Sequence, residues 1–203
     1  MLESLKNQIK AARLRRRVSE ATIEEIQARK LWFIPVPKTG TQSIRARLRG
    51  EFGATFAHEG EIRHHRTASF YRAILGREKW DPLFTFGFTR NPWDRMVSLY
   101  RYKNPDLSFK TWLVQKKSDY LERDTFSYFS DYKGKIIVSF IGRFEQLHKD
   151  FENIRMRIGM TGEGIPHLNR SRHRPYREYY DDETREIVEK KFCRDIEHFE
   201  YRF

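Results

Sequence analysis

A loop of lysine, glycine and hydroxyl residues follows the first apolar stretch of the chain. The stretch, Leu31–Val36, has the length and composition of a buried strand, and the loop reads Lys38-Thr39-Gly40-Thr41-Gln42-Ser43. The pattern after Ser43 is helical, so the loop lies at a helix N-terminus, where backbone N–H groups and the helix dipole attract an anion. Gly40 lets the backbone approach the anion, and Lys38 adds a full charge. These residues predict a phosphate-binding loop; a strand-to-helix turn with a solvated lysine is the alternative.

Residue order separates this loop from the usual nucleotide-binding loop, G-x-x-x-x-G-K-[ST]. In that loop the lysine follows the glycines, whereas here Lys38 precedes Gly40. A P-loop kinase or NTPase acting on a small molecule is therefore kept as the alternative function and not as the leading one.

A second strand-to-helix junction, Thr89–Tyr100, also carries groups that bind anions. Arg90 emerges where the apolar strand Leu83–Thr89 stops, and Ser98 lies on the helix that follows. Ligands of open α/β sheets bind at the carboxyl ends of the strands, so Arg90 and Ser98 are predicted to hold a second phosphate. A helix-capping ion pair between Arg90 and Asp94 is the alternative.

Four segments together resemble one known family. The segments P-K-T-G-T-x-S (Pro37–Ser43) and R-N-P-x-x-R-x-x-S-x-Y (Arg90–Tyr100) resemble the two cofactor motifs of sulfotransferases that use 3′-phosphoadenosine 5′-phosphosulfate (PAPS). The block Ile141–Leu147 resembles the segment near the adenine. The block His167–Ser171, with nearby tyrosines, resembles the C-terminal part of the carbohydrate-type, sulfotransferase family 2-like branch. The resemblance covers Leu31 to Phe203.

The resemblance implies roles for individual residues. The 5′-phosphosulfate would be held by Lys38, Thr39, Gly40, Thr41, Gln42 and Ser43, and the 3′-phosphate by Arg90 and Ser98. Ser171 and Arg172 would close over the cofactor. Gln42 departs from the hydroxyl residue common at its place, although its amide still donates a hydrogen bond. The implied reaction is in-line transfer of the sulfuryl group to a hydroxyl of a carbohydrate or other small polar acceptor, which leaves adenosine 3′,5′-bisphosphate.

This reaction needs a base that removes the proton of the acceptor hydroxyl. Histidines and carboxylates precede the helix predicted to begin near Thr67, and by resemblance His65 is the favoured base, with His64 as the close competitor. The remaining alternatives are His58, Glu59 and Glu61. Lys38 is expected at the bridging oxygen, where it would neutralise the leaving group.

Composition narrows the class of protein and the kinds of site. A chain of 203 residues suits one domain with a substantial core. No apolar run is long enough to cross a bilayer, no signal peptide is evident, and the single cysteine, Cys193, excludes disulfide frameworks and CxxC zinc clusters. These features predict a cytoplasmic protein without a metal site, in which Cys193 packs in the core. The net charge of +12 suits a small anionic ligand; a nucleic-acid-binding module, suggested by the basic run Arg13–Arg17, is a third hypothesis.

Strand and helix patterns alternate along the chain. They predict an α/β, P-loop-like three-layer fold with a central parallel sheet flanked by helices. The third strand is expected over Lys135–Phe144, centred on Ile136–Val138, and the last helix over Asp181–Phe199. Residues 1–30 are predicted to form an N-terminal helical arm before a single sulfotransferase-like domain, residues 31–203. The role of the arm is left open between packing, homo-oligomer formation and binding of a partner.

Overall fold

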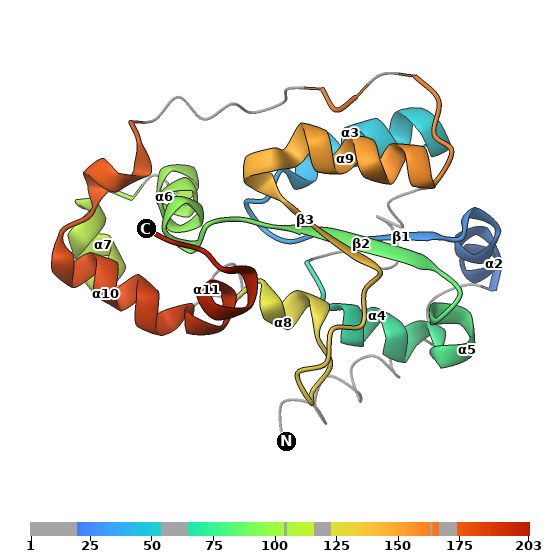
Figure 1. Cartoon of the computed structure of the whole chain (residues 1–203), viewed down its shortest axis with the longest axis horizontal. Helices are drawn as coiled ribbons and strands as arrows, with labels where there is room; N and C mark the ends of the chain where they lie inside the picture. Colours follow the sequence, from blue (N-terminus) through green and yellow to red (C-terminus); the bar gives the residue numbers. More distant parts are fainter. Residues whose placement is uncertain (1–19, 54–64, 104, 116–122, 163, 167–173) are drawn as a thin grey trace.

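A three-stranded parallel sheet forms the centre of the protein (Figure 1). The computed structural model describes residues 20–53, 65–103, 105–115, 123–162, 164–166 and 174–203. The strands are β1 (Leu31–Ile34), β2 (Phe84–Thr89) and β3 (Phe140–Arg143), in the order β1-β2-β3. Both pairs are parallel, so the carboxyl ends of the strands lie at the same edge.

Helices cover both faces of the sheet and its carboxyl edge. Their bounds are α2 Glu20–Arg29, α3 Thr41–Phe52, α4 Ala68–Leu75, α5 Arg77–Trp80, α6 Pro92–Lys103, α7 Phe109–Gln115, α8 Phe126–Phe129, α9 Leu147–Arg157, α10 Asp182–Lys191 and α11 Cys193–Phe199, with short 3-10 helices η3 Phe144–Gln146 and η4 Tyr176–Tyr179. In Figure 1, α3 and α9 lie on one face, α4, α5 and α8 on the other, and α6, α7, α10 and α11 gather beyond the strand ends. The predicted α/β fold with a central parallel sheet between helices is confirmed. None of the described helices combines the length and apolar character needed to span a membrane.

Side chains alternate between the two faces of the sheet, as the two-residue period of a strand requires. Phe33 and Phe86, with ring centroids 5.2 Å apart, pack in one core with residues of α3 and α9. Trp32 and Ile34 belong to the larger core on the opposite face. The sheet is therefore buried on both faces, which explains the nearly continuous apolar composition of β1 and β2.

The third strand, Phe140–Arg143, lies within the predicted range Lys135–Phe144, but Ile136–Val138, on which the prediction centres, lie outside the strand. The N–H of Ile137 donates to the carbonyl of Phe129 at 2.9 Å, and the intervening turn passes through Gly134, whose φ is 80°. The apolar run therefore pairs with the chain that precedes it instead of with β2. Apolar composition alone does not distinguish these two partners.

The predicted last helix is divided into α10 and α11 at Phe192, whose side chain is buried. The break allows Asp195 of α11 to reach the start of α8. There the carboxylate accepts hydrogen bonds from the backbone N–H groups of Thr125, at 2.8 Å, and Phe126, at 2.7 Å. Burial raises the pKa of Asp195. A carboxylate thus replaces the missing intrahelical partners at the first turn of α8.

The same break brings α6 into contact with the C-terminal helices. The guanidinium of Arg95, which is 2% exposed, lies 5.1 Å from the ring centroid of Phe192, and its Nη2 donates to the carbonyl of Arg123 at 2.5 Å. Cys193 follows Phe192 and is exposed, so its predicted packing role is wrong. Phe192, and not Cys193, is the residue that packs inward at this break.

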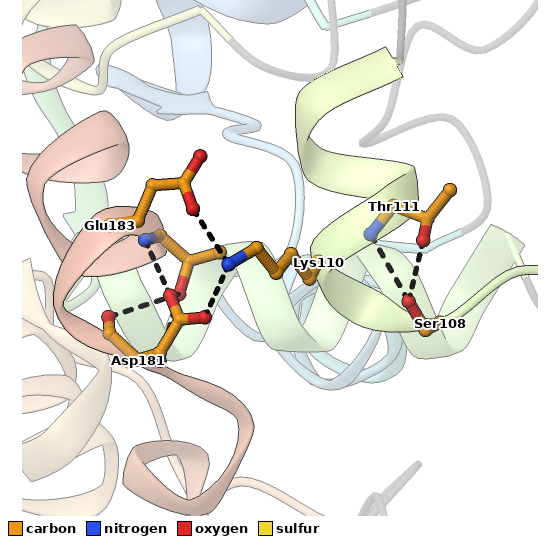
Figure 2. Close-up of polar contacts among 6 residues, drawn as sticks. Ser108, Lys110, Thr111, Asp181 and Glu183 are labelled. Carbon is orange, nitrogen blue, oxygen red and sulfur yellow. Dashed lines mark hydrogen bonds and ion pairs between the residues drawn. The ribbon is translucent and has the colours of Figure 1, made fainter.

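An ion cluster on the surface joins α7 to the start of α10 (Figure 2). The ammonium of Lys110 lies 2.8 Å from the carboxylate of Asp181 and 2.6 Å from that of Glu183. Asp181 also accepts a hydrogen bond from the N–H of Thr184 at 2.8 Å and so caps α10. The hydrogen bonds from Lys110 and Thr184 lower the pKa of Asp181. These side chains are exposed, so the cluster orients the two helices more than it stabilises the fold.

Helix α2 packs into the core on the α4 face of the sheet through Ile23 and Ile26, each 1% exposed. Both residues belong to the predicted N-terminal arm, residues 1–30. Residues 1–19 lie outside the described residues, so an arm that extends beyond α2, and oligomer formation through it, stay predictions.

We expect Gly87→Ala to destabilise the fold by about 1–3 kcal/mol, because neighbouring atoms already occupy the space that the added Cβ would need. A Cβ on Gly87 would lie 2.4 Å from the ring of Phe129 and 3.0 Å from the carbonyl of Ile34. Urea unfolding measures the free energy of unfolding. Gly50→Ala is the matched control, since a Cβ there meets no atom within 4 Å and alanine favours the helix α3. Equal losses in the two variants would contradict the explanation by close packing.

Candidate functional site

The loop between β1 and α3 holds its backbone in a conformation suited to anion binding. Lys38 and Gly40 both adopt the left-handed conformation, with φ of 66° and 79°. This conformation is ordinary for glycine but costs a lysine about 1–3 kcal/mol, a strain that is typical of functional loops. Helix α3 begins at Thr41 with Gly40 as its N-cap. Backbone N–H groups of its first turn, which have no partner within the helix, therefore open onto the loop.

Threonine hydroxyls shape this loop from the inside. Oγ1 of Thr39 and Oγ1 of Thr41 both donate to the carbonyl of Val36, at 3.0 and 2.6 Å, and both side chains are buried. Ser43 is buried in the first turn of α3, whereas Gln42 is exposed. The hydroxyl hydrogens of the two threonines are thus used within the loop and are not available to a ligand.

Arg90 joins the loop to the second motif. Its side chain is buried at the carboxyl end of β2, and its Nη1 donates to the main-chain carbonyl of Lys38 at 3.0 Å. Its Nε and Nη2 each lie 2.9 Å from Oδ2 of Asp94. The guanidinium carbon also lies 4.1 Å from the ring centroid of Phe144. The ion pair with Asp94, the alternative raised from the sequence, is present, and it coexists with a contact to the β1–α3 loop.

Helix α6 places Ser98 on the face that carries Asp94. Asn91 caps this helix, because its Oδ1 accepts hydrogen bonds from the N–H groups of Trp93, at 3.0 Å, and Asp94, at 3.3 Å. Ser98 lies one turn after Asp94 and is buried. The cap therefore fixes the direction in which α6 leaves the strand, and with it the position of Ser98.

Residues after β3 close another side of the loop. A Cβ on Gly40 would lie 2.9 Å from Cδ2 of Leu147 and 3.4 Å from Cδ2 of Phe144. Glycine at this position therefore satisfies both the positive φ and the close approach of these side chains. Since Phe144 also contacts Arg90, the third sequence block touches both of the segments that the sequence predicts to bind anions.

His65 lies beside the start of the loop. Its Nδ1 is 2.7 Å from the carbonyl of Pro35. A carbonyl only accepts hydrogen bonds, so Nδ1 carries the proton, and in the neutral ring Nε2 is the basic nitrogen. Thr67 then caps α4, with its Oγ1 accepting from the N–H of Phe70 at 3.2 Å, as the sequence predicts. The segment from His65 to Thr67 is therefore held at both ends, by the carbonyl of Pro35 just after β1 and by the cap of α4.

The side chain of Lys38 lies against Tyr102 near the C-terminus of α6. Its Nζ is 4.3 Å from the centroid of the tyrosine ring, and this tyrosine is 69% exposed. Burial, and then the charge of Arg90, lower the pKa of Lys38. A bound anion would reverse the second effect, because it would place negative charge between the two cations.

The structure brings Lys38, Arg90 and His65 to one edge of the sheet. The remaining predicted residues His64, Ser171 and Arg172 lie outside the described residues, so their roles stay predictions. Two contacts of the site, those of Tyr102 with Lys38 and of Phe144 with Arg90, are not predicted from the sequence. Tyr102 has a signal in the sequence, since it follows Ser98 by one helical turn. Phe144 belongs to the block Ile141–Leu147, which the resemblance puts near the adenine, but its contacts with Arg90 and Gly40 come only from the tertiary structure.

This arrangement can bind an anion with two charged ends and can accept a proton. The helix N-terminus with Lys38 forms one positive locus, and Arg90 forms a second that is bonded to the first. His65 supplies a basic nitrogen beside them. Within the described ranges, no group of three or more histidine, cysteine, aspartate or glutamate side chains could hold a metal ion.

Comparisons with known proteins agree with this description. A family model described as "Sulfotransferase family" matches residues 26–202. An Archaeoglobus fulgidus protein, itself described only as uncharacterized, is 32% identical over 114 residues, which is 52% of this chain and 92% of that protein. No solved structure matches the chain. Because the family match includes the β1–α3 loop, Arg90 and the block after β3, and spans most of the sequence, the chain belongs to the sulfotransferase family, in its family 2-like branch.

Proposed function

We propose that this protein transfers the sulfuryl group of PAPS to a hydroxyl of a carbohydrate or another small polar acceptor. The contact of Arg90 with the carbonyl of Lys38 carries the proposal, because it makes the two anion-binding segments one continuous site. PAPS has a phosphosulfate at its 5′ position and a phosphate at its 3′ position, so it requires two positive loci on one surface. Membership of the family supports sulfotransfer in general.

The residues fit such a donor in number and kind. In this proposal Lys38 and the backbone N–H groups from Gly40 to Ser43 hold the 5′-phosphosulfate. Arg90 and Ser98 hold the 3′-phosphate. Ser171 and Arg172 cover the bound donor, in keeping with the family resemblance.

The transfer step assigns separate tasks to Lys38 and His65. Nε2 of His65 takes the proton of the acceptor hydroxyl while the acceptor oxygen forms a bond to sulfur. The bond between sulfur and the bridging oxygen breaks, and its electron pair stays on the 5′-phosphate of the bisphosphate product. Lys38 stabilises the negative charge that develops on that oxygen. The hydrogen bond from Nδ1 of His65 to the carbonyl of Pro35 keeps the imidazole in the tautomer that this task needs.

A P-loop kinase or NTPase acting on a small molecule is the alternative, since the same loop would bind nucleotide phosphates. The order of Lys38 and Gly40, and the family match, favour sulfotransfer.

Adenosine 3′,5′-bisphosphate should raise the melting temperature of the protein, because it binds the folded state through both positive loci. A ligand at a hundredfold its Kd stabilises by about 2.7 kcal/mol. Adenosine 5′-monophosphate, which lacks the 3′-phosphate, is the matched control and should give a smaller shift. Absence of a shift with the bisphosphate would contradict the proposal, and an equal shift with magnesium ATP would favour the kinase.

Lys38→Met should lower turnover by about 10²–10³-fold, with a smaller change in affinity for the bisphosphate, because the charge acts on the leaving group. Turnover is measured as bisphosphate released from PAPS. Since burial and Arg90 lower the pKa of Lys38 in the unliganded protein, kcat/KM for PAPS should fall on the alkaline side below pH 10.5, the ordinary lysine value. The variant should lack this fall. Lys149→Met, on the exposed side of α9, is the control; an unchanged alkaline fall in Lys38→Met would exclude Lys38 as its cause.

His65→Asn should lower transfer to saccharide, phenol or alcohol acceptors by about 10²–10⁴-fold. Asparagine can keep a hydrogen bond to the carbonyl of Pro35 but has no basic nitrogen. A thermal shift with the bisphosphate shows whether the donor site survives. His148→Asn, at an exposed position of α9, is the matched control. Full activity of His65→Asn would assign the base to His64 or a nearby carboxylate.

A further inference from the structure

The main-chain carbonyl of Lys38 is held by the side chain of Arg90, the residue that follows β2. Nη1 of Arg90 donates to it at 3.0 Å, and Lys38 has a φ of 66°. A left-handed lysine persists only where its surroundings hold it, because the conformation is strained. The main-chain position of Lys38 sets where its ammonium can reach. Arg90 therefore acts on Lys38 in addition to binding an anion itself.

Arg90 is in turn held by Asp94. Nε and Nη2 both lie 2.9 Å from Oδ2 of Asp94, which uses the side of the guanidinium that faces away from the Lys38 carbonyl. These contacts leave one N–H on each terminal nitrogen for an anion. Phe144 lies against the flat face of the same guanidinium, at 4.1 Å. Arg90 is held in a single orientation because Nε and Nη2 pair with Asp94, Nη1 bonds to the carbonyl of Lys38, and Phe144 lies against the guanidinium.

Asp94 has no place in donor binding, because its carboxylate would repel a phosphate. Its side chain is 18% exposed, and its N–H is already used in the cap of α6. An ion pair four residues apart on an exposed helix contributes only about 0.3–0.5 kcal/mol. Here one partner, Arg90, is 5% exposed, so the carboxylate compensates a buried charge and fixes its direction.

We propose that Asp94 is a positioning residue for sulfuryl transfer, which acts through Arg90 on the backbone of Lys38. The inference rests on the proposed function. Loss of the Asp94 charge would leave the 3′-phosphate bound by Arg90 but would let the guanidinium, and with it the Lys38 carbonyl, shift. The consequence is a loss in turnover and not in donor affinity, because the misplaced ammonium matters most when charge develops on the leaving group.

The test is a double-mutant cycle of Asp94→Asn and Lys38→Met, with turnover measured as bisphosphate released from PAPS. Asp94→Asn should lower kcat roughly ten- to hundredfold and change KM for PAPS by less than about threefold. If Asp94 acts through Lys38, the double variant should be no slower than Lys38→Met alone. If the two residues acted independently, the fold-losses in kcat of the two single variants would multiply in the double variant.

Glu186→Gln is the matched control. It neutralises an acid in another pair four residues apart, with Lys190 at 2.6 Å on α10, and should leave kcat and KM unchanged. Bisphosphate-induced thermal shifts verify that each variant retains a folded donor site. An unchanged kcat in Asp94→Asn, or multiplicative losses in the double variant, would overturn the inference while leaving the proposed function intact. Absence of turnover in the unaltered protein would overturn both.

Discussion

The hydrogen bond from Arg90 to the carbonyl of Lys38 joins two segments that are 52 residues apart in the chain. It depends on the parallel pairing of β1 and β2, which brings their carboxyl ends to one edge of the sheet. Without this contact, the loop after β1 and the motif after β2 would be two separate basic turns. With it, a strained lysine backbone, a buried guanidinium and a helix N-terminus form one electropositive surface.

Two buried arginines on this part of the chain have different environments. Arg90 lies at the end of β2, and its contacts leave N–H groups for a ligand. Arg95 is turned away from the loop, where it contacts the ring of Phe192 and the carbonyl of Arg123. The negative charge of Asp195 offsets part of the cost of burying Arg95. The residues of one motif thus serve both the proposed donor site and the packing of the C-terminal helices.

Helix ends fix most of the functional groups. Gly40 is the N-cap of α3 at the end of the loop, Asn91 caps α6 directly after Arg90, and Thr67 caps α4 two residues after His65. A residue next to a capped end has little backbone freedom, because its neighbour is bound by the first turn. The candidate site therefore combines N–H groups of a helix N-terminus with side chains of restricted direction, and the proposed function requires such preorganisation to stabilise developing charge.

The amino-acid sequence alone predicts the alternation of strands and helices, the two segments suited to anion binding, and the histidine that precedes the cap at Thr67. These features are local, since turn residues, caps and apolar periods act over a few positions. Only the tertiary structure decided that Phe129 and not β2 pairs with Ile137, that Phe192 divides the last helix, and that Cys193 is exposed. It also decided that Arg90 holds Lys38 and that Phe144 supports them both. Such contacts depend on which surfaces meet after folding, and the local pattern of one segment does not specify which distant residues it will contact.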